Sequence, residues 1–147
     1  MKILISSCLL GHQTRYDGKS KPVALPEKWN DAEITHFCPE VAAGFGVPRD
    51  KIELEKTDEK ETRVVRVRDR ADVTKQLAVA CEKEIARFQS EQIKFDLIVL
   101  KSRSPSCGMR TPLHDANGVE IGNDEGVWAA TLREHFPDTP IVDETNL

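Results

Sequence analysis

Residues 95–108 read Phe95-Asp96-Leu97-Ile98-Val99-Leu100-Lys101-Ser102-Arg103-Ser104-Pro105-Ser106-Cys107-Gly108. The first part is an apolar run bounded by turn residues, which is typical of a strand buried on both faces of a parallel sheet. The second part combines hydroxyls, cations and a thiol, and it begins where the strand ends. Open α/β sheets bind their ligands at the carboxyl ends of the strands. We therefore expect residues 101–108 to line a pocket for a metal or an anionic ligand.

Strands and helices alternate along the rest of the chain. Short apolar segments at residues 3–5, 34–37 and 141–142 are expected to be further strands. Asp72 is a favourable N-cap for a helix that extends to about Phe88. Its apolar residues fall on one helical face and comprise Val73, Leu77, Cys81, Ile85 and Phe88. Cys81 is therefore expected in the core, as a small hydrophobic residue. Asp124-Glu125 are expected to open a second helix, which ends near His135.

Turn residues and charge alternation complete the expected fold. Residues 52–56 and 63–68 alternate apolar and charged residues around a polar loop, which predicts a solvent-facing antiparallel hairpin without a chemical role. Asn117-Gly118 and Gly122 are expected to form turns. Strands that alternate with helices indicate βαβ units. The expected fold is α/β: a single Rossmann-like three-layer domain over residues 1–147, with a mainly parallel sheet and a small antiparallel hairpin.

Composition narrows the classes of function. The chain has 147 residues and a formal net charge of −4, without a basic block, which argues against binding to duplex nucleic acid. No apolar run approaches the ~18 residues that a membrane span requires. The apolar N-terminal stretch is broken by Ser6-Ser7-Cys8, so it predicts a strand and not a signal peptide. We therefore expect a cytoplasmic protein, in which cysteines serve metal binding or catalysis before disulfides.

Three of the four cysteines each follow a predicted strand: Cys8, Cys38 and Cys107. The carboxyl ends of parallel strands share one edge of a sheet, so the three thiols are candidates for a common site. Cys38 also precedes Pro39, which typically opens a helix, and a helix N-terminus favours a thiolate. The wide spacing matches neither zinc knuckles nor ferredoxin motifs. The residues alone leave open a metal or cluster site, a reactive thiol pair, or three unrelated cysteines.

Four sequence blocks resemble the signature motifs of one protein family. They are Ser7-Cys8-Leu9-Leu10-Gly11, Arg15-Tyr16-Asp17-Gly18, Cys38-Pro39-Glu40-Val41 and Lys101-Ser102-Arg103-Ser104-Pro105-Ser106-Cys107-Gly108. Pro48-Arg49 and Gly126-Val127, with Ala129, agree as well. The blocks occur in the family's order and span nearly the whole chain. The chain thereby resembles the thiouracil desulfidase family, small bacterial three-cysteine proteins that were long described as a domain of unknown function.

The resemblance implies a cofactor, a reaction and partners. The cofactor is a [4Fe–4S] cluster held by Cys8, Cys38 and Cys107, with one open iron. The reaction is hydrolysis of C=S to C=O in thiolated uracil, without net redox change and with release of hydrosulfide. The partners are a small thiolated pyrimidine and the iron–sulfur assembly machinery. Some relatives carry a further domain and act on thiolated tRNA. Because no such extension or basic surface is evident here, we expect a free base, nucleoside or nucleotide, such as 4-thiouridine.

Three charged residues of these blocks are candidates for catalysis. Glu40 is the expected general base, because it lies two residues beyond a ligand cysteine. Asp17 is the second candidate for this role. Lys101 is expected to stabilise developing negative charge or to pair with Asp17. The alternative for Glu40 is a structural role, as a helix cap or in an ion pair with Arg15 or Arg49.

The remaining polar residues of the blocks are candidates for substrate binding. Ser102, Ser104 and Ser106 are expected to bind the pyrimidine edge or the cluster sulfides, and at least one of them to shape the turn. Arg15 and Arg103 are candidates for a phosphate, if the substrate is a nucleotide. The four histidines, at positions 12, 36, 114 and 135, share no spacing and are expected to have no chemical role.

Two other classes of function are compatible with the residues. A metal- or cluster-binding module with a purely structural site predicts a fourth ligand, such as Glu40 or His12. A thiol-based sulfur carrier that uses Cys107 predicts activity without metal and a persulfide on that residue. Metal content and open coordination distinguish these alternatives from a desulfidase.

Overall fold

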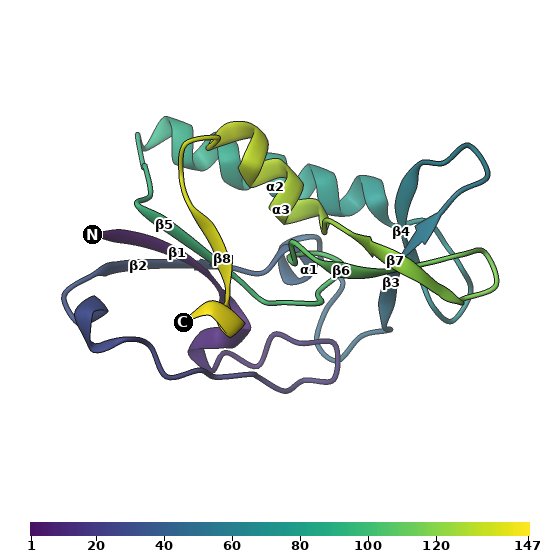
Figure 1. Ribbon diagram of the computed structural model, residues 1–147, viewed down its shortest axis with the longest axis horizontal. Coiled ribbons are helices and arrows are strands. Elements are labelled where there is room, and N and C mark those ends of the chain that lie inside the picture. The colour runs from purple at the N-terminus through teal and green to yellow at the C-terminus, as the bar shows by residue number, and fades with distance from the viewer.

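The computed structural model describes residues 1–147 and contains two four-stranded β-sheets (Figure 1). Sheet A is entirely parallel and has the order β2 (Glu33–Phe37), β1 (Lys2–Ser6), β5 (Leu97–Leu100) and β8 (Ile141–Asp143). Sheet B is mixed and has the order β4 (Thr62–Arg66), β3 (Ile52–Lys56), β6 (Thr111–His114) and β7 (Glu120–Asp124). The predicted α/β class with a mainly parallel sheet is confirmed.

Three α-helices accompany the sheets: α1 (Pro39–Ala42), α2 (Thr74–Ser90) and α3 (Val127–His135). Helices α2 and α3 lie side by side and cover one face of sheet A (Figure 1). The opposite face is covered by 3-10 helices at Ser7–Leu10 and Glu27–Trp29 and by extended chain, so its layer contains no α-helix. None of the helices combines the length and the apolar composition that crossing a bilayer requires.

The central strands of sheet A are buried on both faces because their apolar residues point alternately up and down. Leu4 and Ile98 contribute to the core beneath α2 and α3, which includes Trp128. Ile3 and Val99 contribute to the second core, on the opposite face. The continuous apolar run before the Ser-rich loop is therefore a central strand, as the sequence predicts.

Helix α2 has the predicted buried face, which includes Leu77, Cys81 and Phe88. Cys81 is fully buried, and its predicted place in the core is confirmed. The predicted N-cap is wrong by one residue, because the helix begins at Thr74 and Val73 occupies the cap position. The Asp72 carboxylate still accepts a 2.9 Å hydrogen bond from the Thr74 backbone N–H.

Strands β6 and β7 were not expected from the sequence, because Pro112 and Gly122 are unfavourable inside strands. Asn117-Gly118 forms the predicted turn between them. Gly122 lies within β7, so its prediction as a turn is wrong. Asp124 ends β7 and α3 begins only at Val127, so the predicted helix start at Asp124-Glu125 is also wrong.

Sheet B extends the predicted hairpin into a larger sheet with two unlike faces. Ile52 and Leu54 of β3 lie in an apolar core with Leu77 of α2. The opposite face is polar but only partly exposed: Glu55 is buried and forms ion pairs with Arg63 and Arg70. Burial opposes ionisation of Glu55, but hydrogen bonds from Arg70 and Arg63 outweigh it and lower the pKa of the carboxyl. The prediction of a solvent-facing hairpin is therefore wrong for this face.

Candidate metal centre and substrate pocket

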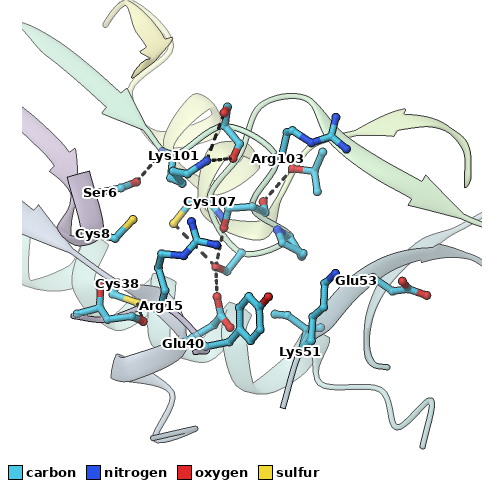
Figure 2. Close-up of a pocket in the computed structure, with 18 of the residues that line it drawn as sticks. Ser6, Cys8, Arg15, Cys38, Glu40, Lys51, Glu53, Lys101, Arg103 and Cys107 are labelled. Carbon is cyan, nitrogen blue, oxygen red and sulfur yellow. Dashed lines mark hydrogen bonds between the residues drawn. The ribbon is translucent and has the colours of Figure 1, made fainter. Parts of the chain in front are cut away.

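The carboxyl ends of β1, β2 and β5 open into a cavity of about 530 Å³ (Figure 2). Cys8, Cys38 and Cys107 line this cavity together with residues 101–106 of the Ser-rich loop. The three cysteines come from three segments that are far apart in the sequence but follow neighbouring parallel strands. The predicted pocket at this edge of sheet A is therefore present.

All three cysteines are free thiols held by short structural elements. Cys8 lies in the 3-10 helix that follows β1 and is 8% exposed. Cys38 follows β2 directly and occupies the N-cap position of α1. Cys107, which is 5% exposed, lies in the loop after β5. Cys8 and Cys107 are thus fixed next to the ends of buried strands and shielded from bulk water, whereas Cys38 follows the edge strand β2 and is only partly buried.

The thiols are electrostatically coupled. Burial raises the pKa of Cys8 to about 11, with a further contribution from Cys38. Burial and the charge of Cys38 raise the pKa of Cys107 well above its ordinary value. Burial also raises the pKa of Cys38, and the backbone N–H groups of Val41 and Glu40 offset only part of this effect. The predicted preference for a thiolate at the helix N-terminus is therefore outweighed, and a cationic centre is needed to hold three thiolates here.

The donor set fits an iron–sulfur cluster better than a single metal ion. No group of three or more His, Cys, Asp or Glu side chains is arranged closely enough to surround one metal ion. Thiolates on a tetrahedral zinc ion lie ~3.8 Å apart, because each Zn–S bond is ~2.3 Å long. In a cluster each thiolate takes a different iron, so the ligands are more widely spaced. Three convergent soft thiolates match that requirement.

The start of α3 anchors the cysteine-bearing loop. The backbone N–H of Gly126 donates a 2.6 Å hydrogen bond to the Gly108 carbonyl, and that of Trp128 donates a 2.7 Å bond to the Ser106 carbonyl. A Cβ atom on Gly126 would lie 2.8 Å from the Ser104 carbonyl oxygen and 2.9 Å from the Cys107 backbone nitrogen. Glycine is therefore required for helix and loop to approach this closely.

Glu40 connects two of the cysteine segments. Its Oε1 accepts a 2.9 Å hydrogen bond from Arg49 Nε, and its Oε2 accepts a 2.7 Å bond from the Ser106 hydroxyl. The Arg49 and Glu40 side chains are 4% and 10% exposed, so this is a buried ion pair. The Ser106 oxygen also lies 3.9 Å from the Cys107 sulfur. The carboxylate is thus held inside the pocket, beside the cysteine loop.

Ser104 shapes the loop, as at least one serine was expected to do. Its hydroxyl accepts a 3.1 Å hydrogen bond from the Cys107 backbone N–H. It also lies 3.2 Å from the Ser106 hydroxyl. A short chain of hydroxyls therefore runs from Ser104 through Ser106 to Glu40 along the pocket wall.

Lys101 pairs with Glu144, not with Asp17 as one alternative had it. Lys101 Nζ lies 3.0 Å from Glu144 Oε1 and donates a 2.7 Å hydrogen bond to the Ser102 carbonyl. Glu144 also accepts hydrogen bonds from the Ser102 N–H (2.7 Å) and hydroxyl (2.6 Å). Burial alone would raise the pKa of Glu144, but the bonds from Ser102 and Lys101 lower it. Sequence reasoning missed Glu144, since it lies in no recognised block.

Arg15 and Asp17 form a long ion pair but differ in their relation to the pocket. Arg15 lines the pocket and lies near the cysteines, whereas Asp17 is exposed and is not among the lining residues (Figure 2). Arg15 Nε is buried and lies 3.9 Å from Asp17 Oδ1, which is too long for a hydrogen bond. Arg103 also lines the pocket and is exposed. The geometry favours Glu40 over Asp17 as the carboxylate close to the thiols.

The structure adds pocket residues that sequence reasoning left without a chemical role: Lys51, Glu53, His114 and Glu120. They come from β3, β6 and β7 or from the residue before β3. The Asn117-Gly118 turn, with β-branched residues nearby, was the available signal for the β6–β7 hairpin. His114, which was expected to have no chemical role, lies in the lining of the pocket. His12 and His36, in contrast, stack on each other with ring centroids 4.2 Å apart, and neither is a lining residue.

A family model described as 2-thiouracil desulfurase matches residues 3–144 of the chain. The chain belongs to this family. The solved structure of a [4Fe–4S]-dependent thiouracil desulfidase, TudS, is similar, with a TM-score of 0.73 and 33% sequence identity. The match covers 99% of this chain and 92% of TudS. The uncharacterized protein YbbK of Bacillus subtilis (strain 168) is 28% identical over 137 residues, which cover 90% of this chain and 89% of YbbK.

Membership of the 2-thiouracil desulfurase family confirms the resemblance seen in the cysteine blocks, and TudS confirms the fold. The family assignment and the TudS match support an iron–sulfur-dependent enzyme of thiouracil desulfidation.

Proposed function

We propose that this protein hydrolyses the thiocarbonyl group of thiolated uracil to a carbonyl group. One water molecule is consumed, the C=S bond is replaced by C=O, and sulfur leaves as hydrosulfide with a proton, so that no electrons are gained or lost. The observation that carries the proposal is the convergence of three thiols, two buried and one partly buried, and the Glu40 carboxylate in one cavity. Family membership and similarity to TudS support the same chemistry.

Cys8, Cys38 and Cys107 are the residues that would hold a [4Fe–4S] cluster. Such a cluster, with three protein ligands, supplies one open iron that acts as a Lewis acid toward a thiocarbonyl sulfur. The raised pKa values of Cys8 and Cys107 agree with ligands that are ionised only when metal is present. Cluster delivery makes the iron–sulfur assembly machinery an expected partner.

Glu40 is the proposed general base. Its carboxylate lies beside the Ser106 hydroxyl, which in turn is next to Cys107. A water molecule in this part of the pocket can transfer its proton to Glu40 while its oxygen attacks the C–S carbon. The ion pair with Arg49 fixes the carboxylate in this orientation. Ser106 is proposed to orient the water or the pyrimidine edge.

Lys101 and the loop hydroxyls are proposed to bind the reacting part of the substrate. Lys101 is held by Glu144 and the Ser102 carbonyl at the edge of the pocket, where its positive charge stabilises developing negative charge. Ser102 and Ser104 are proposed contacts to polar atoms of the pyrimidine. Asp17 is the weaker candidate for the base, because it is exposed and does not line the pocket.

The substrate is proposed to be a thiolated uracil as base, nucleoside or nucleotide, with sulfur at position 2 or 4. Arg15 and Arg103 line the pocket and are candidates for an anionic or carbonyl group of such a substrate. Free thiols throughout the chain agree with a reducing, cytoplasmic setting. We propose that residues 1–147 act as a single catalytic domain.

The test is anaerobic purification followed by iron and acid-labile sulfide assays and a hydrosulfide-release assay on one sample. 2-Thiouracil, 4-thiouracil and the corresponding nucleosides and monophosphates serve as substrates. The expected result is about four iron and four sulfide per chain, together with release of hydrosulfide and appearance of the oxygenated pyrimidine. Hydrosulfide release without a change in redox state of the sample supports hydrolysis.

Two outcomes would overturn the proposal. A full metal site without turnover of any of these substrates would indicate a structural metal or cluster module. Turnover by metal-free protein, together with a persulfide already present on Cys107 in the protein as purified, would indicate a thiol-based sulfur carrier. Mass spectrometry of the intact chain detects the persulfide directly.

A further inference from the structure

Ser6 is the last residue of β1, and its hydroxyl has no part in the proposed hydrolysis although it lines the pocket. Ser6 is 2% exposed. Residues two apart in a strand point to the same face, so Ser6 points with Leu4 toward the side of sheet A on which Cys107 is packed. A buried hydroxyl therefore lies beside the loop that carries a proposed cluster ligand.

The Ser6 hydroxyl has one hydrogen and finds no oxygen or nitrogen atom of the chain to accept it. The Ser6 oxygen accepts a 3.0 Å hydrogen bond from the Lys101 backbone N–H, which joins the ends of β1 and β5 (Figure 2). This bond uses a lone pair and leaves the hydroxyl hydrogen free. Buried hydroxyls nearly always have an acceptor. Here the acceptor is the Cys107 sulfur: a hydrogen bond from Ser6 lowers the pKa of that thiol, against the larger effects of burial and of Cys38.

The other hydroxyl near the Cys107 sulfur is already engaged. Ser106 Oγ lies 3.9 Å from this sulfur, but the Ser106 hydroxyl donates a 2.7 Å hydrogen bond to Glu40. A hydroxyl has a single hydrogen, and a carboxylate is the stronger acceptor. Ser6 is therefore the side-chain donor that remains for Cys107.

A donor to a ligand sulfur changes the properties of the iron to which that sulfur is bound. Hydrogen bonds to the sulfurs help to set the reduction potential of an iron–sulfur cluster. Reduction adds negative charge to the sulfur ligands, so a donor stabilises the reduced state more than the oxidised state and raises the potential. The same withdrawal of charge from sulfur leaves the iron more electrophilic, which suits a Lewis acid.

We propose that Ser6 is a positioning residue of the metal centre, which donates a hydrogen bond to the Cys107 thiolate and thereby sets the charge on this ligand. Its oxygen at the same time holds Lys101, the first residue of the Ser-rich loop. The proposal rests on the proposed function for the presence of a cluster on Cys107. It concerns the electronic state of the cluster and assigns Ser6 no contact with the substrate.

The test is a reductive titration of the cluster-loaded protein, followed by electron paramagnetic resonance. Ser6→Ala is expected to lower the ratio of reduced to oxidised cluster at a fixed potential by two- to tenfold, which for a one-electron couple is a shift of about 20–60 mV to lower potential. Ser6→Thr keeps the hydroxyl and should restore most of this loss. Thr131→Val is the matched control, because it removes a buried hydroxyl that is bonded to the Val127 carbonyl and does not line the pocket. It should leave the potential unchanged.

A full iron content with an unchanged potential in Ser6→Ala would overturn the proposal. An equal shift in Ser6→Thr and Ser6→Ala would do so as well, since it would trace the effect to packing and not to the hydroxyl. If Ser6→Ala does not fold, resonance Raman spectra of the unaltered protein decide: the Fe–S(Cys) stretching bands should differ between H₂O and D₂O, and identical bands would overturn the hydrogen bond. A chain that assembles no cluster would overturn the proposed function, whereas a full cluster with an unchanged potential overturns only the role of Ser6.

Discussion

The Ser106 hydroxyl donates a 2.7 Å hydrogen bond to Oε2 of Glu40, a residue 66 positions earlier in the chain. Ser106 immediately precedes Cys107, and Glu40 lies two residues after Cys38. The bond therefore joins two of the three cysteine-bearing segments and aligns a carboxylate with the thiols. Arg49 completes the arrangement by binding the other oxygen of Glu40.

Glu40→Gln is expected to lower kcat by about 10²- to 10⁴-fold, the usual contribution of a general base. Glutamine retains an oxygen that can accept from Ser106 or Arg49, so the iron and sulfide content should stay at the level of the unaltered protein. Single-turnover kinetics on anaerobically prepared protein, with iron determined on the same sample, measure both quantities.

The control for this change is Glu134→Gln, which removes an exposed carboxylate on α3. It should retain full activity. If Glu40→Gln loses iron in proportion to its activity, Glu40 supports the metal site and is not the base.

Glu144→Gln is expected to lower kcat/KM by about tenfold, because the loss of a charged hydrogen-bond acceptor costs ~1.5–3 kcal/mol and releases Lys101 and Ser102. The pKa of Glu144 is lowered from its ordinary value of 4.5, so its contacts are complete above that pH and are lost only as the pH falls through the lower folded value. The ratio of variant to unaltered kcat/KM should therefore be constant between about pH 6 and 9. A ratio that changes within this range would show that Glu144 titrates there and would contradict its assignment as a permanent anion.

Cys81→Ala is expected to keep full iron content and activity, whereas Cys107→Ala should lose the cluster. Cys81 lies on the buried face of α2, where burial, followed by the charges of Glu82 and Cys38, raises its pKa to about 12. Removing its sulfur leaves a small cavity and should cost ~1 kcal/mol of unfolding free energy. Iron assays and urea unfolding on the two variants measure these effects. Iron loss in Cys81→Ala would identify it as a fourth ligand and support a closed, structural site.

The sequence predicts the part of the site in which a cysteine directly follows a strand. Cys8, Cys38 and Cys107 each follow an apolar strand, and parallel pairing brings such ends together without further information. The residues that bind these segments from distant parts of the chain could not be predicted in the same way. Glu144 lies at the opposite end of the chain from β1, and its bonds to Ser102 arise only because β8 pairs with β5. Contacts of this kind depend on sheet order, which local patterns do not encode.

Sheet B shows a second reason why the sequence analysis did not identify all of the pocket residues. The sequence predicts β3 and β4 from charge alternation, but it gives no sign that their polar face turns toward the pocket and not to bulk solvent. Pro112 and Gly122 obscured β6 and β7, the strands that complete this face of the sheet. His114 therefore looked like an isolated histidine, although its ring is oriented by Leu54 and Glu53.

Gly126→Ala is expected to release the cysteine loop from α3 and to lower the iron content. The added Cβ would lie 2.8 Å from the Ser104 carbonyl oxygen and 2.9 Å from the backbone nitrogens of Cys107 and Gly108. All three atoms belong to the backbone, so the clash is relieved only if the loop or the helix moves. Overpacking of this kind costs ~1–3 kcal/mol, and here it displaces the segment that carries Cys107, a proposed cluster ligand.

Gly118→Ala is the matched control, because Gly118 has a φ of +80° and no atom within 4 Å of an added Cβ. It should cost ~1 kcal/mol of stability through backbone strain alone and retain its iron. Iron content and thermal unfolding of the two variants, prepared in parallel, separate loss of stability from displacement of the loop. If Gly126→Ala binds iron as well as Gly118→Ala does, the loop has room to adjust, and close packing against α3 is not what holds Cys107 in place.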